Sequence, residues 1–316
     1  MPIENHREEF ACDVRKGLSK PRKELHSKYL YDELGSSLFD AITHLPEYPL
    51  TRADERLLCA NSSAIARLIP SPVAVIELGS GMGRKTRTVL SAIQPRNPQL
   101  RFFPIDVSRE ALVRCERDLA DLAAVYPFEQ SYLHGLAGAV AERRRGETLL
   151  VLFLGSNIGN FERPCAFEFL REVRQNLHPG DALLLGADLV KDRERMLLAY
   201  DDPTGLTAAF NLNLLGRINR ELGGNFNLRD FQHEARWDEP QRRIEMHLRS
   251  RIDQTVDIAH ADLRVHFAAD ETIWTESSHK FQMPELLQMA AATGFDIEEH
   301  WIDRDWPFVE SIWIAH

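Results

Sequence analysis

The chain lacks any long apolar run. The longest, Leu149 to Leu154, is far shorter than the roughly 20 residues needed to cross a bilayer as a helix. The first residues, MPIENHREEFACDVRKG, are charged throughout and contain no apolar stretch of the kind that an export signal needs. We therefore expect neither a membrane-spanning nor an exported protein.

Cysteine is scarce as well. The four cysteines, Cys12, Cys59, Cys115 and Cys165, are widely spaced and form no C-x-x-C pair. This pattern predicts neither a disulfide framework nor a zinc ribbon, so no metal site is expected. The cytoplasm is the expected compartment, since its reducing conditions keep isolated thiols free.

Basic charge is in deficit. The 38 Lys and Arg residues are outnumbered by 48 Asp and Glu residues, which gives a net charge of -10. Such a balance argues against a surface built to neutralise phosphate backbones, so no nucleic-acid partner is expected. The hydrophobic fraction of 44% is enough for a folded core, and only the first fifteen or so residues look loose.

Short apolar runs alternate with helical periodicity from Thr51 to about Lys191. This rhythm is typical of an α/β fold with a mostly parallel sheet and helices on both faces. The expected strands are Val73 to Leu78, Leu100 to Ile105, Leu149 to Leu154 and Ala182 to Leu189, and the expected helices include Arg87 to Ile93, Arg109 to Leu122 and Pro164 to Leu177.

The rhythm stops after Asp192, where we infer that a second, smaller α+β domain is inserted. Residues 243–259 alternate between apolar and polar side chains, as do 263–267 and 272–278, which predicts antiparallel, half-buried strands. Beyond a helix at 284–293, a terminal hairpin is expected to return to the first sheet. The predicted domains are therefore 52–192 with 280–316, and 1–51 with 193–279.

The strongest local motif is VIELGSGMGRKT at 75–86. A buried strand ends in Glu77 and is followed by Gly79, Gly81 and Gly83, which let the chain turn sharply and let a ligand touch the backbone. A dinucleotide fingerprint and a P-loop would both need glycine at position 84, where the chain has Arg84. What remains resembles the E-x-G-x-G-x-G loop of class I methyltransferases, which lies under S-adenosylmethionine.

An acidic residue stands where such a cofactor would need one. Asp106 ends the next strand, 27 residues after Gly79, where its carboxylate can accept from both ribose hydroxyls. The alternative is a tight turn at the glycines, with Asp106 and Ser108 capping the following helix.

The loop after the third expected strand, GSNIGNF at 155–161, should face the reactive end of the cofactor. An Asn oxygen there can orient an amine lone pair without taking its proton. Asn160 suits this role. For Asn157, orienting the amine and forming a turn are equally well supported by the sequence.

Several blocks outside the glycine loop make the resemblance specific. They are KYLYDELGSSLFDAITHLPEYPLTRADE at 28–55, AYDDPTGLTAAFNLNLLGRINRELGGNF at 199–226, IEMHL at 244–248 and TESSHKF at 275–281. With the glycine loop they resemble the family of histidine N-alpha-methyltransferases of ergothioneine biosynthesis, over nearly the whole chain from about residue 19. Members of that family use three S-adenosylmethionine molecules to trimethylate the α-amino group of L-histidine, giving hercynine.

The resemblance implies a role for individual residues and assigns S-adenosylmethionine to domain 52–192 with 280–316. It implies that Glu276 and Ser278 read the imidazole, with Met246 lining the imidazole pocket. It places Tyr48 near the imidazole and the amine, and Phe39 in an aromatic wall of the pocket. It also implies that Tyr200 bonds the substrate carboxylate and that Asn160 holds the α-amino group. On the cofactor side it points to Gly79, Lys85 and Asp106, with Glu77, Gly81 and Gly83 shaping the loop. We expect Tyr48 to orient the substrate rather than act as a base.

Two of these assignments agree with local geometry. Residues two apart on a strand project from one face about 7 Å apart, so Glu276 and Ser278 can address one small ring. Without the resemblance, Glu276 and Ser278 would be predicted to lie on a solvated strand face. Met246 alternates with Ile244 and Leu248, which by itself predicts a core residue.

The chain departs from the family pattern at two places. Asn157 stands where members more often have a small hydroxyl residue. Gly135 and Leu136 stand where bacterial members often have an acidic-aromatic pair that contacts adenine, so an adenine contact is expected at these positions without those side chains.

The expected activity is thus in-line methyl transfer to the α-amine of L-histidine, by a monomer. The nearest alternative is an N-methyltransferase acting on another small amino acid or amine. A nicotinamide oxidoreductase is disfavoured by Arg84, and a module that binds S-adenosylmethionine without catalysis is disfavoured by the polar residues expected around the substrate.

Overall fold

The computed structural model describes residues 3–316, with side chains from residue 7 onward. By its internal contacts the chain divides into two compact units. Unit 1 comprises Met1–Pro49 and Lys191–His279, and unit 2 comprises Leu50–Val190 and Lys280–His316. The predicted domain boundaries lie within two residues of these limits.

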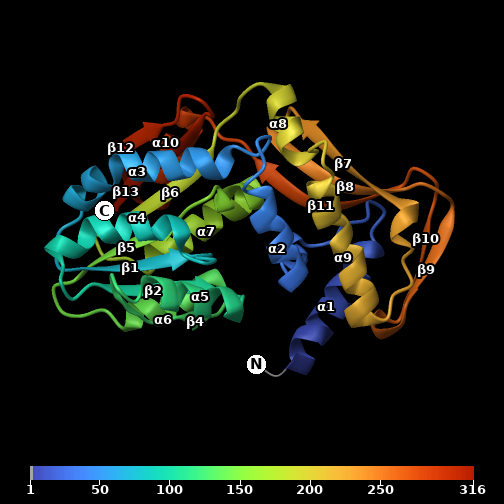
Figure 1. Ribbon diagram of the computed structural model, residues 1–316, viewed down its shortest axis with the longest axis horizontal. Helices are drawn as coiled ribbons and strands as arrows, with labels where there is room; N and C mark the ends of the chain where they lie inside the picture. The colour runs from blue at the N-terminus through green and yellow to red at the C-terminus, as the bar shows by residue number, and fades with distance from the viewer. Residues whose placement is uncertain (1–2) are drawn as a thin grey trace. The chain divides into compact units, whose positions relative to one another are not determined.

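Unit 2 is built on one large sheet with helices on both faces (Figure 1). Its strands are β1 (Val73–Leu78), β2 (Arg101–Asp106), β3 (Ala124–Val125), β4 (Phe128–Glu129), β5 (Thr148–Phe153), β6 (Ala182–Asp188), β12 (Phe295–Ile302) and β13 (Phe308–Ala315). Its α-helices are α3 (Leu50–Leu68), α4 (Arg84–Ile93), α5 (Arg109–Leu119), α6 (Tyr132–Ala141), α7 (Arg163–Gln175) and α10 (Met283–Thr293). Short 3-10 turns lie at Gln94–Arg96 and Asn157–Asn160.

The strand order across this sheet is β12-β13-β6-β5-β1-β2-β3, with β4 beside β2. The strands β6, β5, β1, β2, β3 and β4 run parallel, while the hairpin β12–β13 joins β6 antiparallel. This is the predicted α/β sheet with a terminal hairpin. The strand order reverses at β1, which has β2 on one side and β5 on the other, and ligands in such sheets lie outside the carboxyl ends of the strands at such a point.

Both faces of β1 are buried, because alternate residues point into two separate cores. Ala74, Ile76 and Leu78 pack with side chains of α6, α7 and α10. Val73 and Val75 pack with side chains of α3, α4 and α5. Strands covered on both faces need apolar residues at nearly every position, which is why these strands are readable as continuous apolar runs.

Unit 1 is an α+β arrangement with a three-stranded antiparallel sheet of order β11-β8-β7 and a separate hairpin β9–β10. Its strands are β7 (Phe231–Asp238), β8 (Arg243–Ser250), β9 (Gln254–Ile258), β10 (Leu263–Phe267) and β11 (Thr272–His279). Its α-helices are α1 (Ile3–Leu18), α2 (Glu33–Ile42), α8 (Arg193–Tyr200) and α9 (Leu206–Leu222), with 3-10 turns at Ser27–Leu30, Leu228–Asp230 and Ala259–Ala261.

The expectation of a loose N-terminus is wrong. Residues from Ile3 onward form α1, and Phe10, Val14 and Leu18 are buried. Their spacing of four residues places them on one helical face, which the polar residues around them obscure in the sequence.

The predicted half-buried strand at 243–259 is also wrong in two respects. It is two strands, and the polar face of β8 is buried rather than solvated. Glu245 and His247 are both buried, and Glu245 accepts hydrogen bonds from the His247 ring at 2.9 Å and from Arg243. Mutual pairing lets these polar side chains leave water, so alternation in sequence did not mean alternation in burial.

Candidate active site

The glycine loop of unit 2 follows β1 and turns through left-handed backbone. Gly79, Gly81 and Gly83 have φ angles of 75°, 51° and 70°, which side-chain-bearing residues rarely adopt. A Cβ on Gly81 would meet no atom within 4 Å, so the backbone there is open to a ligand. The loop therefore has the conformation and the access that S-adenosylmethionine requires.

Asp106 lies at the end of β2, beside this loop. Its Oδ2 accepts from the Gly81 amide at 2.9 Å, and its Oδ1 accepts from the Ser108 amide at 2.9 Å. Each oxygen retains a lone pair, so the half-buried carboxylate can still accept from ribose hydroxyls. The helix cap after β2 is made by Ser108, whose hydroxyl accepts from the Ala111 amide. The residues present fit an adenosine cofactor.

Glu77 lies near the end of β1, two residues before Gly79. Its side chain is buried in unit 2, where it accepts a hydrogen bond from Thr86 Oγ1 at 2.5 Å. Burial raises the pKa of Glu77 to about 8, although the bond from Thr86 opposes this shift. Glu77 thus links β1 to α4 through its hydrogen bond with Thr86, and its carboxyl is buried.

Lys85 is the second residue of α4 and is held by a buried carboxylate. Its Nζ lies 2.5 Å from Oδ2 of Asp54, which is itself fully buried in α3. Burial alone would lower the pKa of Lys85, but the charge and hydrogen bond of Asp54 outweigh it and raise that pKa. Lys85 is therefore a fixed cation beside the glycine loop.

The loop after β5 carries both predicted asparagines and lies against the glycine loop. Gly155 and Ser156 are both left-handed, and Asn157–Asn160 then form a 3-10 turn. The Asn157 amide nitrogen lies 3.2 Å from where a Cβ on Gly79 would stand, whereas Asn160 is exposed. The structure thus brings Asn157 to the glycine loop and leaves the Asn160 side chain accessible.

The side-chain positions of Gly135 and Leu136 are turned into the core of unit 2. Leu136 in α6 is fully buried, and a Cβ on Gly135 would lie 2.4 Å from Ile105. They offer no side-chain contact to adenine. Tyr132, one turn earlier, was missed: its hydroxyl lies 3.2 Å from the Cβ position of Gly79, and burial with the Asp106 charge raises its pKa to about 12.

In unit 1, β11 presents the predicted imidazole readers on one face. Glu276 pairs with Met246 of β8 and Ser278 pairs with Ile244, so all four side chains share that face of the sheet. Met246 and Ser278 are buried, and Glu276 is half-buried. Met246 is thus both a core residue and a neighbour of the predicted pair, as the sequence allowed.

The predicted aromatic residues of unit 1 form a connected row. The rings of Tyr48 and Tyr200 are 6.0 Å apart and those of Phe39 and Tyr48 are 6.2 Å apart, both edge to face. The Tyr200 hydroxyl lies 2.7 Å from Ser278 Oγ. Phe210, which the sequence did not single out, extends the row with its ring 5.9 Å from that of Phe39.

His233, which the sequence did not single out, holds the backbone of Tyr200. The buried His233 ring donates from Nε2 to the Tyr200 carbonyl at 2.8 Å, and its Nδ1 accepts from the Asn211 amide at 2.9 Å. Burial lowers the pKa of His233, so the ring is neutral and its tautomer is set by these two bonds. A lone histidine in β7 carries no sequence signal for this role.

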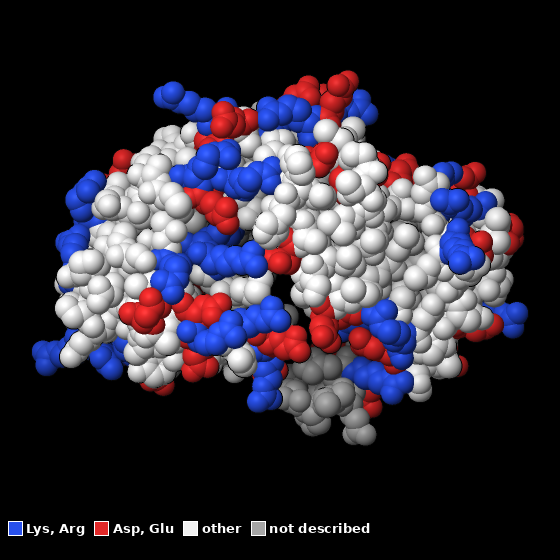
Figure 2. Space-filling view, in the orientation of Figure 1, with Lys and Arg blue, Asp and Glu red and all other residues white. Residues whose placement is uncertain are grey.

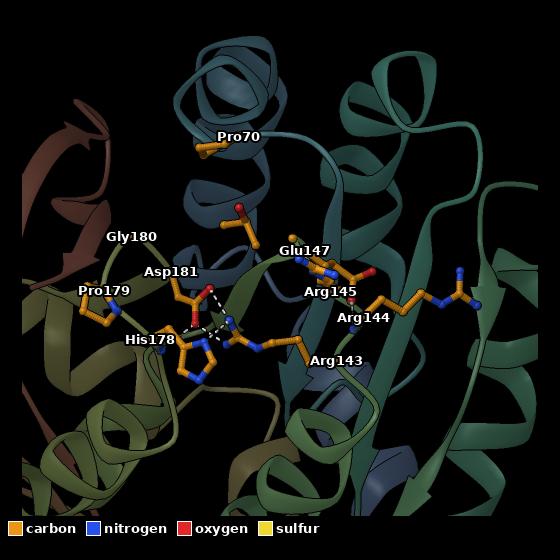
Figure 3. Close-up of a pocket in the computed structure, with 11 residues that line it drawn as sticks. Pro70, Arg143, Arg144, Arg145, Glu147, His178, Pro179, Gly180 and Asp181 are labelled. Atoms are coloured by element: carbon orange, nitrogen blue, oxygen red, sulfur yellow. Dashed lines mark hydrogen bonds and ion pairs between the residues drawn. The ribbon is translucent and has the colours of Figure 1, made fainter.

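The pocket in Figure 3 lies at the opposite edge of the unit 2 sheet, where β5 and β6 begin. It measures about 460 Å³ and is lined by Arg143, His178 and Asp181 among others. Asp181 already accepts from Arg143 and from the amides of Leu149 and His178. None of the predicted site residues lines this pocket.

The comparison with known families decides the identity. A model of the family described as histidine-specific methyltransferase, SAM-dependent, matches residues 10–314. The chain belongs to this family. The predicted fold class, the dependence on S-adenosylmethionine and the recognised family are thereby confirmed.

Named relatives agree with this membership in the histidine-specific methyltransferase family. The chain is 42% identical to a histidine N-alpha-methyltransferase of Mycolicibacterium smegmatis, covering 92% of this chain and 90% of that one. It is 41% identical to one of Mycobacterium tuberculosis, with the same coverage. It is 33% identical to ergothioneine biosynthesis protein 1 of Schizosaccharomyces pombe, covering 88% of this chain but 37% of that longer protein.

Proposed function

We propose that this methyltransferase transfers three methyl groups to the α-amino group of L-histidine and so forms hercynine, the first step of ergothioneine biosynthesis. The observation that carries the proposal is the single face of β11 and β8 on which Glu276, Met246 and Ser278 lie, with Tyr200 bonded to Ser278. The carboxylate of Glu276 and the hydroxyls of Ser278 and Tyr200 are complementary to the imidazole and the carboxylate of histidine. The named relatives support the same substrate.

Each polar group of the substrate has a proposed partner. Glu276 accepts from an imidazole N–H, and Ser278 bonds the same ring. Tyr200 donates to the carboxylate of histidine. An amino acid with an apolar side chain would leave the Glu276 carboxylate unpaired, which makes the pair selective for histidine.

The amine is oriented by the remaining residues. Asn160 accepts from the α-amino group through its neutral amide oxygen and so directs the lone pair without taking the proton. Asn157 is proposed to help place the main-chain groups of the substrate. Tyr48 orients the amine, and with Phe39 it offers aromatic faces to the cation that forms as methyl groups accumulate.

On the donor side, Gly79, Gly81 and Gly83 shape the loop, Asp106 binds the ribose and Lys85 provides the fixed positive charge. S-adenosylmethionine, when bound, supplies the electrophilic methyl group for in-line displacement. The chain's own contribution is alignment of the neutral amine, with no covalent intermediate.

The division of labour is part of the proposal. Unit 2 is proposed to bind S-adenosylmethionine and unit 1 to bind the amino acid. Within residues 3–316, no helix combines the length and apolar character needed to span a bilayer. On the face shown in Figure 2, acidic and basic side chains are interspersed. A monomer that acts on a small molecule in the cytoplasm is proposed.

Mass spectrometry of the purified protein with S-adenosylmethionine and each common amino acid in parallel tests this function. A trimethylated product from L-histidine alone supports it. Methylation of a different amino acid instead would overturn the substrate assignment and favour the alternative of another small amine.

A further inference from the structure

Three segments of unit 2 meet at one buried carboxylate. Asp54 of α3 is fully buried, and its Oδ2 accepts from Lys85 Nζ at 2.5 Å and from the Gly155 amide at 3.0 Å. Lys85 lies in the first turn of α4, two residues after Gly83 of the glycine loop. Gly155 opens the loop that carries Asn157 and Asn160. One oxygen atom therefore ties the predicted donor-side lysine to the asparagine loop.

A second carboxyl lies against the first. Glu310 of β13 is fully buried, and it interacts electrostatically with Asp54 and with Lys85. Neither of its oxygens is met by an N–H or O–H donor from the described residues. A buried carboxyl that meets no donor and stands near a negative charge favours its neutral, protonated form.

The charges in this cluster favour the neutral form of Glu310. Burial, together with the negative charge of Asp54, raises the pKa of Glu310 well above its ordinary value. This shift favours a neutral Glu310 beside the ion pair of Asp54 and Lys85. The group is electrically balanced, as a buried cluster must be to avoid a large desolvation cost.

Two glycines make room for the cluster. A Cβ on Gly186 of β6 would lie 2.5 Å from Glu310 Oε1, and one on Gly155 would lie 2.9 Å from Lys85 Nζ. A larger residue at 186 would push the Glu310 carboxyl out of its place. The sheet is thus shaped around Glu310, although its carboxyl touches none of the residues assigned to ligands except through Asp54.

We propose that Asp54 is a positioning residue for methyl transfer, which fixes Lys85 and the start of the asparagine loop, and that Glu310 holds Asp54 in place. The inference rests on the proposed function, because Lys85 and Asn160 are the proposed contacts to donor and amine. Without Asp54, Lys85 would lose its orientation and the Gly155 amide would lose its acceptor. Both losses displace groups that must be aligned for in-line transfer, and small displacements of this kind are costly.

The test compares Asp54→Asn with a matched control, Glu147→Gln. Glu147 forms a buried ion pair with Arg101, with side chains 6% and 5% exposed, at the other edge of the same sheet. Both substitutions remove one buried carboxylate from an ion pair, so both should lower the melting temperature. Only Asp54→Asn should also weaken binding at the proposed cofactor site.

Two readouts separate positioning from stability. Calorimetric titration with S-adenosylhomocysteine should show binding about 10-fold weaker or more for Asp54→Asn, and within about 2-fold of wild type for Glu147→Gln. Hydrogen exchange should rise in peptides that cover 154–160 for Asp54→Asn and stay unchanged for Glu147→Gln. Unchanged affinity and unchanged exchange in a folded Asp54→Asn variant would overturn the proposal.

A second variant covers the case in which Asp54→Asn does not fold. Glu310→Ala keeps the Asp54–Lys85 ion pair but removes the carboxyl that supports Asp54, and it should weaken S-adenosylhomocysteine binding about 3-fold or more. Affinity equal to wild type in this variant would overturn the role proposed for Glu310. Since S-adenosylhomocysteine binding needs no methyl acceptor, these results are interpretable even if histidine is not the substrate.

Discussion

The hydroxyls of Tyr200 and Ser278, 78 positions apart in the chain, lie 2.7 Å from each other. Tyr200 ends α8 and Ser278 stands near the end of β11. This bond joins the proposed reader of the substrate carboxylate to one of the proposed readers of its imidazole. The two side chains should therefore act as a unit in binding rather than independently.

The coupling can be measured with a double-mutant cycle. Tyr200→Phe and Ser278→Ala should each raise the KM for histidine by about 10-fold, the worth of one lost hydrogen bond to a charged or polar group. The double variant should be less impaired than the product of the two single effects, because both remove the same bond. Strictly multiplicative effects on KM would show that the two hydroxyls act separately.

Glu276 should determine the choice of amino acid. Glu276→Leu removes the carboxylate that an imidazole N–H needs, so kcat/KM for histidine should fall by about 100-fold or more relative to that for phenylalanine or leucine. Competition assays with product masses resolved by mass spectrometry give this ratio directly. Glu234→Gln, on the same sheet in β7 and bonded to Arg236, is the matched control and should leave the ratio unchanged. An unaltered ratio in the Glu276 variant would mean that another residue selects the ring.

Activity should rise with pH into the mildly alkaline range. The attacking amine must be neutral, and the α-amino group of a free amino acid is almost entirely protonated near neutral pH. Histidine should therefore be a better nucleophile as pH rises, and Tyr48 is too weak a base near neutral pH to remove this dependence. Initial rates at saturating S-adenosylmethionine from pH 6 to 9 check it. A flat profile would show that some group of the protein removes the proton efficiently.

The buried Glu77 should make stability fall as pH rises. Its pKa is raised by burial to about 8 from an ordinary value of 4.5, so the folded protein holds a proton that the unfolded chain releases. Its contribution to stability is fully present below about pH 4.5 and is lost as pH rises to about 8. Glu77→Gln keeps the shape without the titration, so its free energy of unfolding relative to wild type should increase over this window, by at most about 5 kcal/mol.

Urea denaturation of both proteins at pH 5, 7 and 9 measures this difference. An exposed glutamate of α7, Glu172, serves as the control, and Glu172→Gln should show no such trend. If the Glu77→Gln variant keeps a constant difference from wild type at all three pH values, then Glu77 is ionised in the folded state.

Much of unit 2 was predictable because its signals are local. A strand buried on both faces is a continuous apolar run, and the glycine loop needs left-handed residues within a few positions of each other. The terminal hairpin and the helix at Met283–Thr293, which ends at Gly294, were readable for the same reason. The family blocks gave the remaining site residues, whose roles stay predictions.

What the sequence did not decide depends on contacts between distant segments. The polar face of β8 is buried because Glu245 finds His247 and Arg243, and α1 is ordered because Phe10, Val14 and Leu18 are covered. The sequence predicts an adenine contact at Gly135 and Leu136, and the structure shows that their side-chain positions face the core.

The sequence by itself determined the α/β class, the glycine loop, the acid that follows β2 and the family. Only the tertiary structure decided which charged side chains lie together in the interior. Asp54, Lys85 and Glu310 are far apart in the chain, and each alone looks like a surface residue. Charges can be buried only where opposite charges and hydrogen-bond donors compensate them, and that compensation exists only after the sheet has folded.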